Sequence, residues 1–187
     1  MRLFVSVDLP GELAPAVESV QDDLRDASGL DFTDPTQAHL TLKFLGETDP
    51  ERLDEIGDAL GEAVAAADVA PFEATVEGIG AFPSPEYIQV VWLGIGRGAE
   101  ELTRLHEAIE TRTTELGFDP EDHEFTPHVT LARMNHAGGK DLIQRVLRER
   151  EPELGSMRVE EVRLKESDLG ADGPTYSTVE RFPLGAV

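Results

Sequence analysis

The sequence contains no cysteine, one tryptophan and three lysines, namely Lys43, Lys140 and Lys165. Without cysteine the chain forms no disulfide, no thiolate zinc site and no cysteine nucleophile. This composition is compatible with a reducing compartment. Arginine supplies every other positive side chain, so any basic site must be built mainly from arginine and histidine.

Long apolar runs are also missing. No stretch reaches the roughly 18 consecutive apolar residues that a membrane-spanning helix requires. The apolar beginning of the chain is too short for a signal peptide, and Asp8 interrupts it. We therefore expect a cytoplasmic protein without a membrane partner, in which residues 2–8 form the first strand.

Negative charge dominates the composition. The chain has 38 acidic and 16 basic residues and a formal net charge of −22. A nucleic-acid-binding protein is ordinarily basic, because it must neutralise phosphates. Here the acids are spread along the chain rather than gathered in a tail, which is typical of adaptation to high salt. At molar ionic strength the screening length falls to about 3 Å, so an acidic protein can approach a phosphate through a locally basic site.

Strand-like and helix-like segments are mixed along the 187 residues, which predicts an α+β fold. Runs of β-branched and aromatic residues predict strands at 2–8, 38–45, 72–80, 87–95, 124–133, 157–168 and 175–182. Apolar residues at helical spacing predict helices at 13–28, 50–64, 98–116 and 142–147. No segment is long enough to be a linker, so we expect residues 1–187 to form a single domain. We also expect the protein to be a monomer.

One motif occurs twice. The sequence His-Leu-Thr-Leu at 39–42 returns as His-Val-Thr-Leu at 128–131, 89 residues later and close to half the chain length. A repeat at this spacing predicts two similar, intertwined lobes that each contribute one strand to a shared cleft.

Each repeated motif offers an imidazole and a hydroxyl on one face of a strand. Residues two apart in a strand share a face, so His39 lies beside Thr41 and His128 beside Thr130, with the intervening apolar residues in the core. Histidine titrates near neutrality and can serve as acid or base. Two histidines can therefore hydrolyse a phosphodiester without metal, while the threonine hydroxyls donate hydrogen bonds to the phosphate oxygens.

Three non-catalytic or metal-dependent interpretations of the motif stay open. A single His-x-Thr on a strand is most often a packed or surface histidine, and an ancient duplication can preserve histidines for structural reasons. Two histidines and a carboxylate can also bind zinc or iron. No H-x-H or H-E-x-x-H pattern supports that, so no metal is expected.

The motifs and several other stretches resemble the 2H phosphoesterases, in particular the RNA 2′,3′-cyclic phosphodiesterases (LigT-like, historically called 2′-5′ RNA ligases). The similar stretches cover nearly the whole chain in order: MRLFV at 1–5, HLTLKFLG at 39–46, GAFPSP at 80–85, FTPHVTLAR at 125–133, LKES at 164–167 and GPTY at 173–176. With the acidic composition, the resemblance indicates a salt-adapted archaeal source.

The resemblance implies two pseudo-symmetric α/β lobes with antiparallel sheets that flank a central cleft. It also implies hydrolysis of a terminal 2′,3′-cyclic phosphate of RNA, or of a cyclic nucleotide, to a 2′-phosphomonoester without metal or cofactor. On this basis we expect His39 to be the proton donor and His128 the proton acceptor, with Thr41 and Thr130 binding the substrate.

Two basic residues are further candidates for substrate binding. Arg133 matches a basic residue that follows the second motif in this family. It lies five residues after His128, however, so a regular strand places it on the opposite face. Lys43 has the parity to stand beside His39, although a solvated strand lysine is an equally good interpretation. By the same parity, Phe44 is expected in the core rather than as a platform for a nucleobase.

Two alternative functions stay open. The same scaffold can catalyse 2′-5′ RNA ligation, although water favours hydrolysis. A non-catalytic RNA-end-binding module has less support, because the sequence shows neither a basic stripe nor an aromatic platform.

The chain has three further histidines. We expect His106 to be at the surface or partly packed on a helix, His123 to be in a solvated turn and His136 to be in a loop.

Overall fold

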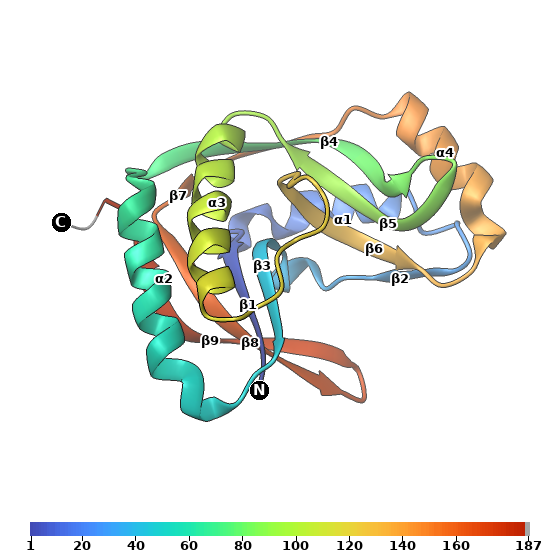
Figure 1. Ribbon diagram of the computed structural model, residues 1–187. Coiled ribbons are helices and arrows are strands. Elements are labelled where there is room, and N and C mark those ends of the chain that lie inside the picture. The colour runs from blue at the N-terminus through green and yellow to red at the C-terminus, as the bar shows by residue number, and fades with distance from the viewer. Residues whose placement is uncertain (186–187) are drawn as a thin grey trace.

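The computed structural model describes residues 1–185 and shows an α+β fold built on a curved antiparallel sheet (Figure 1). The strands are β1 (Arg2–Asp8), β2 (Leu30–Phe32), β3 (His39–Glu47), β4 (Phe72–Ser84), β5 (Tyr87–Ile95), β6 (His128–Met134), β7 (Glu153–Val159), β8 (Glu161–Gly170) and β9 (Gly173–Pro183). The expected fold class is thereby confirmed.

The strand order places the two motifs at the centre of the sheet. The order is β7-β4-β5-β6-β3-β1-β8-β9, with β2 paired to the far end of β6. Three strands flank β3 on one side and three flank β6 on the other, so the sheet has two related halves. The pair formed by Leu40 and Val129 joins the halves.

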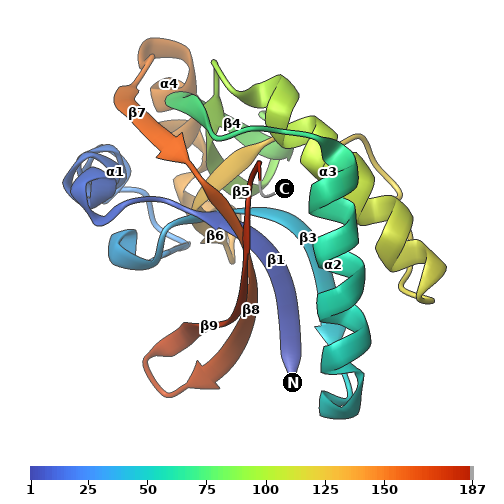
Figure 2. The ribbon, with the colours of Figure 1, turned by 90° about the vertical axis from the view of Figure 1, so that its left-hand side faces the viewer.

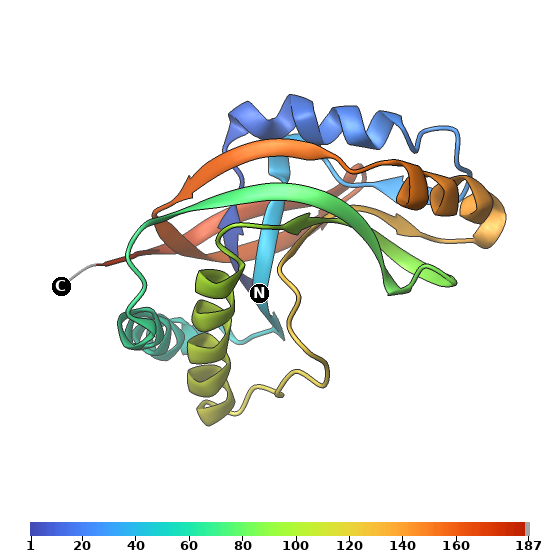
Figure 3. The same ribbon diagram turned by 90° about the horizontal axis from the view of Figure 1, so that it is seen from above.

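The helices form two pairs, α1 with α4 and α2 with α3, which lie on opposite sides of the molecule (Figures 2 and 3). All four contribute to one core, which also contains Leu40 and Val129 of the central strands. They are α1 (Ala14–Asp22), α2 (Leu53–Ala67), α3 (Ala99–Glu115) and α4 (Lys140–Glu149), with short 3-10 helices η1 (Gly11–Leu13), η2 (Pro35–Gln37), η3 (Pro50–Arg52) and η4 (Ala137–Gly139). Helix α1 follows β1 but packs on β6, and α3 follows β5 but packs on β3. Each of these two helices thus covers the half of the sheet opposite to its own strand.

The helices bury the apolar stripes that their sequences predict. Ile56 and Leu60 of α2, and Leu102, Leu105 and Ile109 of α3, have no exposed surface. Each such side chain contributes about 1.5–3 kcal/mol by leaving water. Among residues 1–185, no helix is long and apolar enough to cross a membrane.

Both motif strands contain a β-bulge. In β3, Leu42 is an extra residue relative to β1, as is Leu45 further along, and in β6, Leu131 is an extra residue relative to β5. The bulges at Leu42 and Leu131 directly follow the motif threonines. Each bulge leaves two consecutive side chains buried, Leu42 with Lys43 and Leu131 with Ala132. A bulge therefore reverses the alternation of faces for the residues that follow it.

Several expected boundaries were wrong. The strand expected at 157–168 is two strands, because the chain passes from one half of the sheet to the other: β7 pairs with β4, and β8 pairs with β1 and β9. The strand expected from 124 begins only at His128, directly after Pro127, which cannot donate to a ladder. Strand β2 was not expected, and α1 ends at Asp22 rather than near residue 28.

Candidate functional site

The two motif histidines lie on the face of the central strands that points away from the core. Leu40 and Val129, which pair across the strands, both point into the core. In this register, His39 and His128 each lie across from the threonine of the other motif. The two histidines are therefore diagonal neighbours on adjacent strands. The Cα atoms of such neighbours lie about 7–8 Å apart. At that separation two imidazoles can contact one phosphate. The topology therefore brings the two His-x-Thr pairs together as the repeat predicts.

Backbone carbonyls hold both imidazoles in the same way. Nδ1 of His39 lies 3.0 Å from the carbonyl oxygen of Gln37, and Nδ1 of His128 lies 2.7 Å from that of Thr126. Because a carbonyl can only accept, each Nδ1 carries the proton and donates it. The tautomer assigned in this way leaves each Nε2 available to a substrate.

Aromatic side chains pack around His39. The ring of Phe4 lies 5.0 Å from the imidazole between centroids, and that of Tyr176 lies 4.9 Å away edge to face. Burial lowers the pKa of His39, as do Lys165 and Arg133, whereas the Gln37 carbonyl and the Asp8 carboxylate oppose the shift.

A different pair of aromatic residues packs around His128. Phe82 lies 4.9 Å from its ring, edge to face, and Trp92 lies 6.0 Å away. Burial again lowers the pKa of His128, and Arg133 contributes in the same direction. Among residues 1–185, no carboxylate acts on this pKa to raise it.

Asp8 distinguishes the two halves of the site. It lies across from His39 on β1, whereas the residue across from His128 on β5 is Gly94. The Asp8 carboxylate accepts hydrogen bonds from Arg163 at 3.0 Å and Lys165 at 2.6 Å. Within residues 1–185, these contacts fix a negative group beside the His39 imidazole and none beside that of His128.

A small polar pocket adjoins the His39 half of the site. Its volume is about 160 Å³. It is lined by Asp8, Leu9, Thr36, Gln37, Ala38, Lys165 and Tyr176. Because Gln37 and Tyr176 also contact the His39 ring, the pocket extends the site towards β8 and β9.

Arg133 lies on the same face as the histidines, although strict alternation placed it on the opposite one. The bulge at Leu131 and Ala132 reverses the parity, so Arg133 is exposed while both preceding residues are buried. Its guanidinium is close enough to contribute to the lowered pKa values of His39 and His128. Within residues 1–185 no acidic partner of Arg133 is present, so its charge is available to an anion.

The prediction that Lys43 stands beside His39 is wrong. The Lys43 side chain is 1% exposed and lies on the core side, because the bulge in β3 turns it there. Its ammonium lies 3.2 Å from the Glu110 carboxylate and donates to the Asp119 carbonyl at 2.6 Å, with Glu121 at 3.8 Å.

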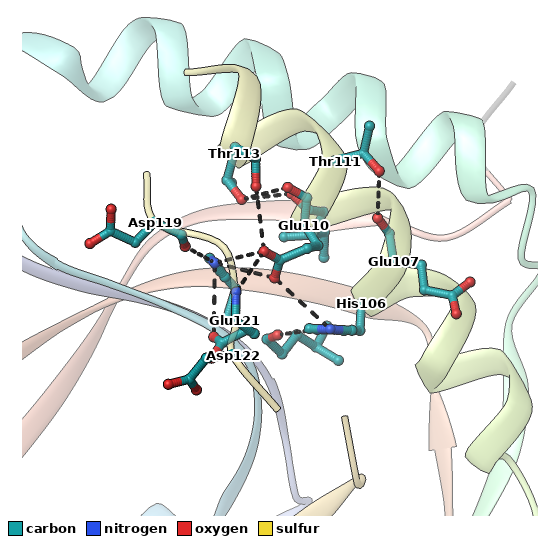
Figure 4. A network of polar contacts seen from close by, with 12 residues as sticks. His106, Glu107, Glu110, Thr111, Thr113, Asp119, Glu121 and Asp122 are labelled. Carbon is teal, nitrogen blue, oxygen red and sulfur yellow. Dashed lines mark hydrogen bonds and ion pairs between the residues drawn. The ribbon is translucent and has the colours of Figure 1, made fainter. Parts of the chain in front are cut away.

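The acidic groups around Lys43 belong to a larger network of polar contacts between α3 and the segment that leads to β6 (Figure 4). Burial raises the pKa of Glu110, but the Glu121 amide and the Lys43 ammonium outweigh it, and the net pKa is lowered. The Glu110 carboxylate and the Lys43 ammonium are thus both charged. Lys43 stabilises the packing of α3 against β3 and is not part of the exposed face that carries the histidines.

Phe44 was expected in the core and is instead 61% exposed. The bulge that buries Lys43 turns Phe44 outwards, and its ring lies 6.3 Å from Phe4, which contacts His39. Phe44 precedes Arg133 by 89 residues, the spacing of the two motifs. The site therefore has an aromatic ring in one half where the other half has a guanidinium.

Sequence reasoning also missed residues that lie far from the motifs in the chain. Phe4, Asp8 and Tyr176 reach the site only through strand pairing and carried no motif of their own. The stretches 1–5 and 173–176, which supported the family resemblance, contain two of them.

The remaining histidines differ in environment. His106 is buried, 7% exposed, rather than at the surface. His123 has a side chain that is 72% exposed, as expected, and His136 is an exposed loop residue that accepts a hydrogen bond from the Gly138 amide. In the described part of the chain, no three His, Asp or Glu side chains gather as metal ligands would.

This curled antiparallel sheet, with a His-x-Thr strand from each half at its centre, has the architecture of the 2H phosphoesterases. A family model described as the 2′-5′ RNA ligase superfamily matches residues 9–171. The RNA 2′,3′-cyclic phosphodiesterase of Methanothermobacter thermautotrophicus is 36% identical over 98% of this chain and 99% of its own length. The protein of the same name from Aeropyrum pernix is 41% identical over 75% of this chain and 78% of its own.

Structural comparison agrees with the sequence comparison. The crystal structure of TT0787 of Thermus thermophilus superimposes with a TM-score of 0.80 at 34% identity, covering 98% of both chains. The protein described here belongs to the 2′-5′ RNA ligase superfamily.

Proposed function

We propose that this protein is an RNA 2′,3′-cyclic phosphodiesterase, which hydrolyses a terminal 2′,3′-cyclic phosphate to a 2′-phosphomonoester. The observation that carries the proposal is the geometry of His39 and His128. Both donate Nδ1–H to a carbonyl and keep Nε2 available on one face of the sheet. Full-length relatives with this name support the choice of substrate.

In the proposed reaction, His128 takes a proton from water through Nε2 as the oxygen attacks phosphorus. The bond from phosphorus to the ribose 3′-oxygen breaks, and His39, which enters this step as the imidazolium with protons on both ring nitrogens, donates its Nε2 proton to that oxygen. The products are a 2′-phosphate and a free 3′-hydroxyl. Thr41 and Thr130 donate hydrogen bonds to the non-bridging oxygens, and Arg133 balances the charge that grows there. Each proton is thus transferred between groups on the same face of the sheet.

The division between acid and base follows from the surroundings of the two rings. An acid must hold its proton until the leaving oxygen needs it, and a nearby carboxylate favours the protonated imidazole. Arg133 lowers the pKa of both rings, and Lys165 also lowers that of His39. The Asp8 carboxylate opposes these effects at His39, whereas His128 has no compensating carboxylate in the described chain. This asymmetry supports His39 as the proton donor and His128 as the proton acceptor.

Phe44 extends the proposed site towards the nucleobase. An exposed aromatic ring beside a phosphate site can stack on a base without selecting its identity. Lys43 is not part of the proposed substrate site, because its ammonium is buried and paired. The substrate is therefore an RNA end or a cyclic nucleotide held by Arg133 and Phe44.

We further propose that the protein is a cytoplasmic monomer adapted to high salt. The net charge of −22 supports the salt adaptation, because self-repulsion of this size is relieved when the Debye length is about 3 Å. Activity in molar potassium chloride that is lost at low salt is the expected behaviour.

The decisive experiment uses an RNA oligonucleotide with a 2′,3′-cyclic phosphate end, with EDTA and about molar salt. We expect a 2′-phosphate product, and a loss of about 10²–10⁴-fold in rate for His39→Ala and for His128→Ala. His123→Ala, which changes an exposed histidine, is the matched control and should keep full activity. Full activity of both motif variants would rule the mechanism out.

Ligation is the second candidate, since the matching family model is described by that activity. It would join a cyclic-phosphate end to a 5′-hydroxyl end through a 2′-5′ linkage, without water. Incubation of paired RNA halves distinguishes it by the joined product. A module that only binds RNA ends would retain that binding in both alanine variants and show no product.

A further inference from the structure

We propose that Gln21 and His106 are positioning residues that hold the two β-bulges, so that Arg133 and Phe44 face the substrate. The inference rests on the proposed function for the roles of Arg133 and Phe44. It concerns two buried polar side chains that touch neither the motif histidines nor the substrate face.

The bulges decide which side chains reach the site. Without the extra residue in each strand, strict alternation would point Phe44 and Arg133 into the core. A bulge also leaves a residue outside the regular ladder, and its buried carbonyl needs a donor from elsewhere. The bulged residues are Leu42 in β3 and Leu131 in β6.

His106 supplies the donor for the bulge in β3. Its Nδ1 donates to the Leu42 carbonyl oxygen at 2.8 Å. The imidazole is stacked on the Phe125 ring at 4.1 Å between centroids, and its Nε2 lies 4.0 Å from the Glu110 carboxylate. Figure 4 shows His106 at one end of the polar network on α3. The contacts with Phe125 and Glu110 therefore fix the ring in the position from which its Nδ1 donates to the Leu42 carbonyl.

Gln21 supplies a donor for the bulge in β6. It is completely buried on α1, and its Nε2 donates to the Leu131 carbonyl oxygen at 3.1 Å and to that of Thr33 at 2.8 Å. Thr33, which directly follows β2, also donates to the Leu131 carbonyl through its amide at 3.0 Å, and its hydroxyl lies 2.9 Å from the Thr130 carbonyl. The bulge is thus tied to α1 and to the end of β2 at once.

The two contacts occupy equivalent positions. Each acceptor is the fourth residue of its His-x-Thr-Leu motif, and each donor comes from the helix that packs on that strand. The donors are different residue types, so the common feature is the hydrogen bond to the bulge and not the sequence. This recurrence indicates that holding the bulge is the shared task.

A double-mutant cycle tests whether Gln21 acts through Arg133. Gln21→Met keeps the length and removes the donor. Oε1 of Gln21 is buried without a partner in the described residues, so methionine also removes an unsatisfied acceptor, which offsets part of the stability lost with the donor. We expect about a tenfold loss in kcat/KM for Gln21→Met alone, and less than about a twofold further loss when Arg133→Met is already present.

The reciprocal cycle uses His106→Phe, which keeps the stacking on Phe125 but cannot donate. Its effect should fall on KM and vanish in a Phe44→Ala background, while it stays additive with Arg133→Met. His106→Gln restores a donor of the kind used by α1 and should recover part of the loss. Glu107→Gln, on the exposed side of α3, is the control.

The outcomes separate the two proposals. An inactive wild-type protein would refute the proposed function. The inference would then be tested by a crystal structure of Gln21→Met, in which Arg133 must leave the exposed face. Additive effects in both cycles, or an unchanged Arg133 position in that structure, would overturn the inference. Thermal unfolding of each variant separates loss of positioning from loss of folding.

Discussion

Strands β3 and β6 carry the same motif and share the same backbone geometry, but their surroundings differ. In both, the carbonyl two residues before the histidine accepts a hydrogen bond from Nδ1–H, and a bulge follows the threonine. Five residues after the histidine, β3 has Phe44 and β6 has Arg133. Across from the histidine, the neighbouring strand has Asp8 in one half and Gly94 in the other.

The difference shows how a symmetric frame can support an asymmetric reaction. The repeated features hold two imidazoles and two hydroxyls, which either direction of proton transfer would need. The unique features are the Asp8 carboxylate, which opposes the lowering of the His39 pKa, and the exposed guanidinium of Arg133. In the proposed mechanism, acid and base are thus distinguished by neighbours and not by the motifs themselves.

Of the variants considered, Arg133→Met should lower kcat/KM the most. It removes the available positive charge from the β6 half, where a transition-state anion needs it. We expect kcat/KM to fall by about 100-fold or more, the usual effect of losing one anion-stabilising donor. Steady-state kinetics on a cyclic-ended dinucleotide measures it. A loss under about threefold would show that Arg133 does not contact the phosphate.

Lys43→Met tests the buried half of the bulge in β3, where β6 has Ala132. The variant leaves the Glu110 and Glu121 carboxylates, 21% and 27% exposed, without their cation. We expect about 2–3 kcal/mol of destabilisation, below the cost at a fully dry pair because both acids reach water.

Urea unfolding measures the stability of Lys43→Met, and Lys140→Met is the matched control. KM of the folded variant should stay within about twofold of wild type. A large rise in KM at unchanged stability would instead return Lys43 to the substrate site.

Phe44→Ala should have a smaller effect, confined to binding. Stacking of a base on an aromatic ring is worth about 1–3 kcal/mol, so we expect KM to rise about tenfold while kcat changes little. Phe44→Tyr should restore binding. Equal losses for a cyclic nucleotide and for an abasic cyclic phosphate would argue against stacking.

Asp8→Asn should change kcat/KM the least. The direction in which it shifts the pH profile shows which histidine is the acid. His39 works as an acid only while protonated, so kcat/KM falls as pH rises through its pKa. Loss of the Asp8 carboxylate lowers that pKa further and moves the falling limb of the pH profile to lower pH.

Activity of Asp8→Asn should therefore decline at about pH 8 and change little at about pH 5. If the acidic limb moved instead, His39 would be the base and the roles would be exchanged. Because burial lowers the pKa of both imidazoles, the wild-type optimum should lie on the acidic side of neutrality.

The sequence predicted the fold class and the two motif strands well, because their signals are local. Apolar spacing located four helices, and alternation around His39 and His128 placed their side chains opposite the core. Alternation failed at Lys43, Phe44 and Arg133, where each strand gains an extra residue. A bulge depends on pairing with a neighbouring strand and on donors from a distant helix, so no local pattern revealed it.

The split of the expected strand 157–168 has a similar cause. Its residues have uniformly high strand preference, but the two parts pair with β4 and β1, which lie in different halves of the sheet. The two parts follow each other directly in the sequence, and only the pairing with distant strands shows where one ends.

The amino-acid sequence by itself determined the repeated His-x-Thr motif, the absence of thiol chemistry and the acidic charge. These follow from residue identity and from spacing of two along a strand. The tertiary structure decided which side chains join the histidines, because two bulges, held by Gln21 and His106, reverse the alternation. It also brought Asp8 and Tyr176 to His39 through strand pairing, which makes two similar halves chemically unequal.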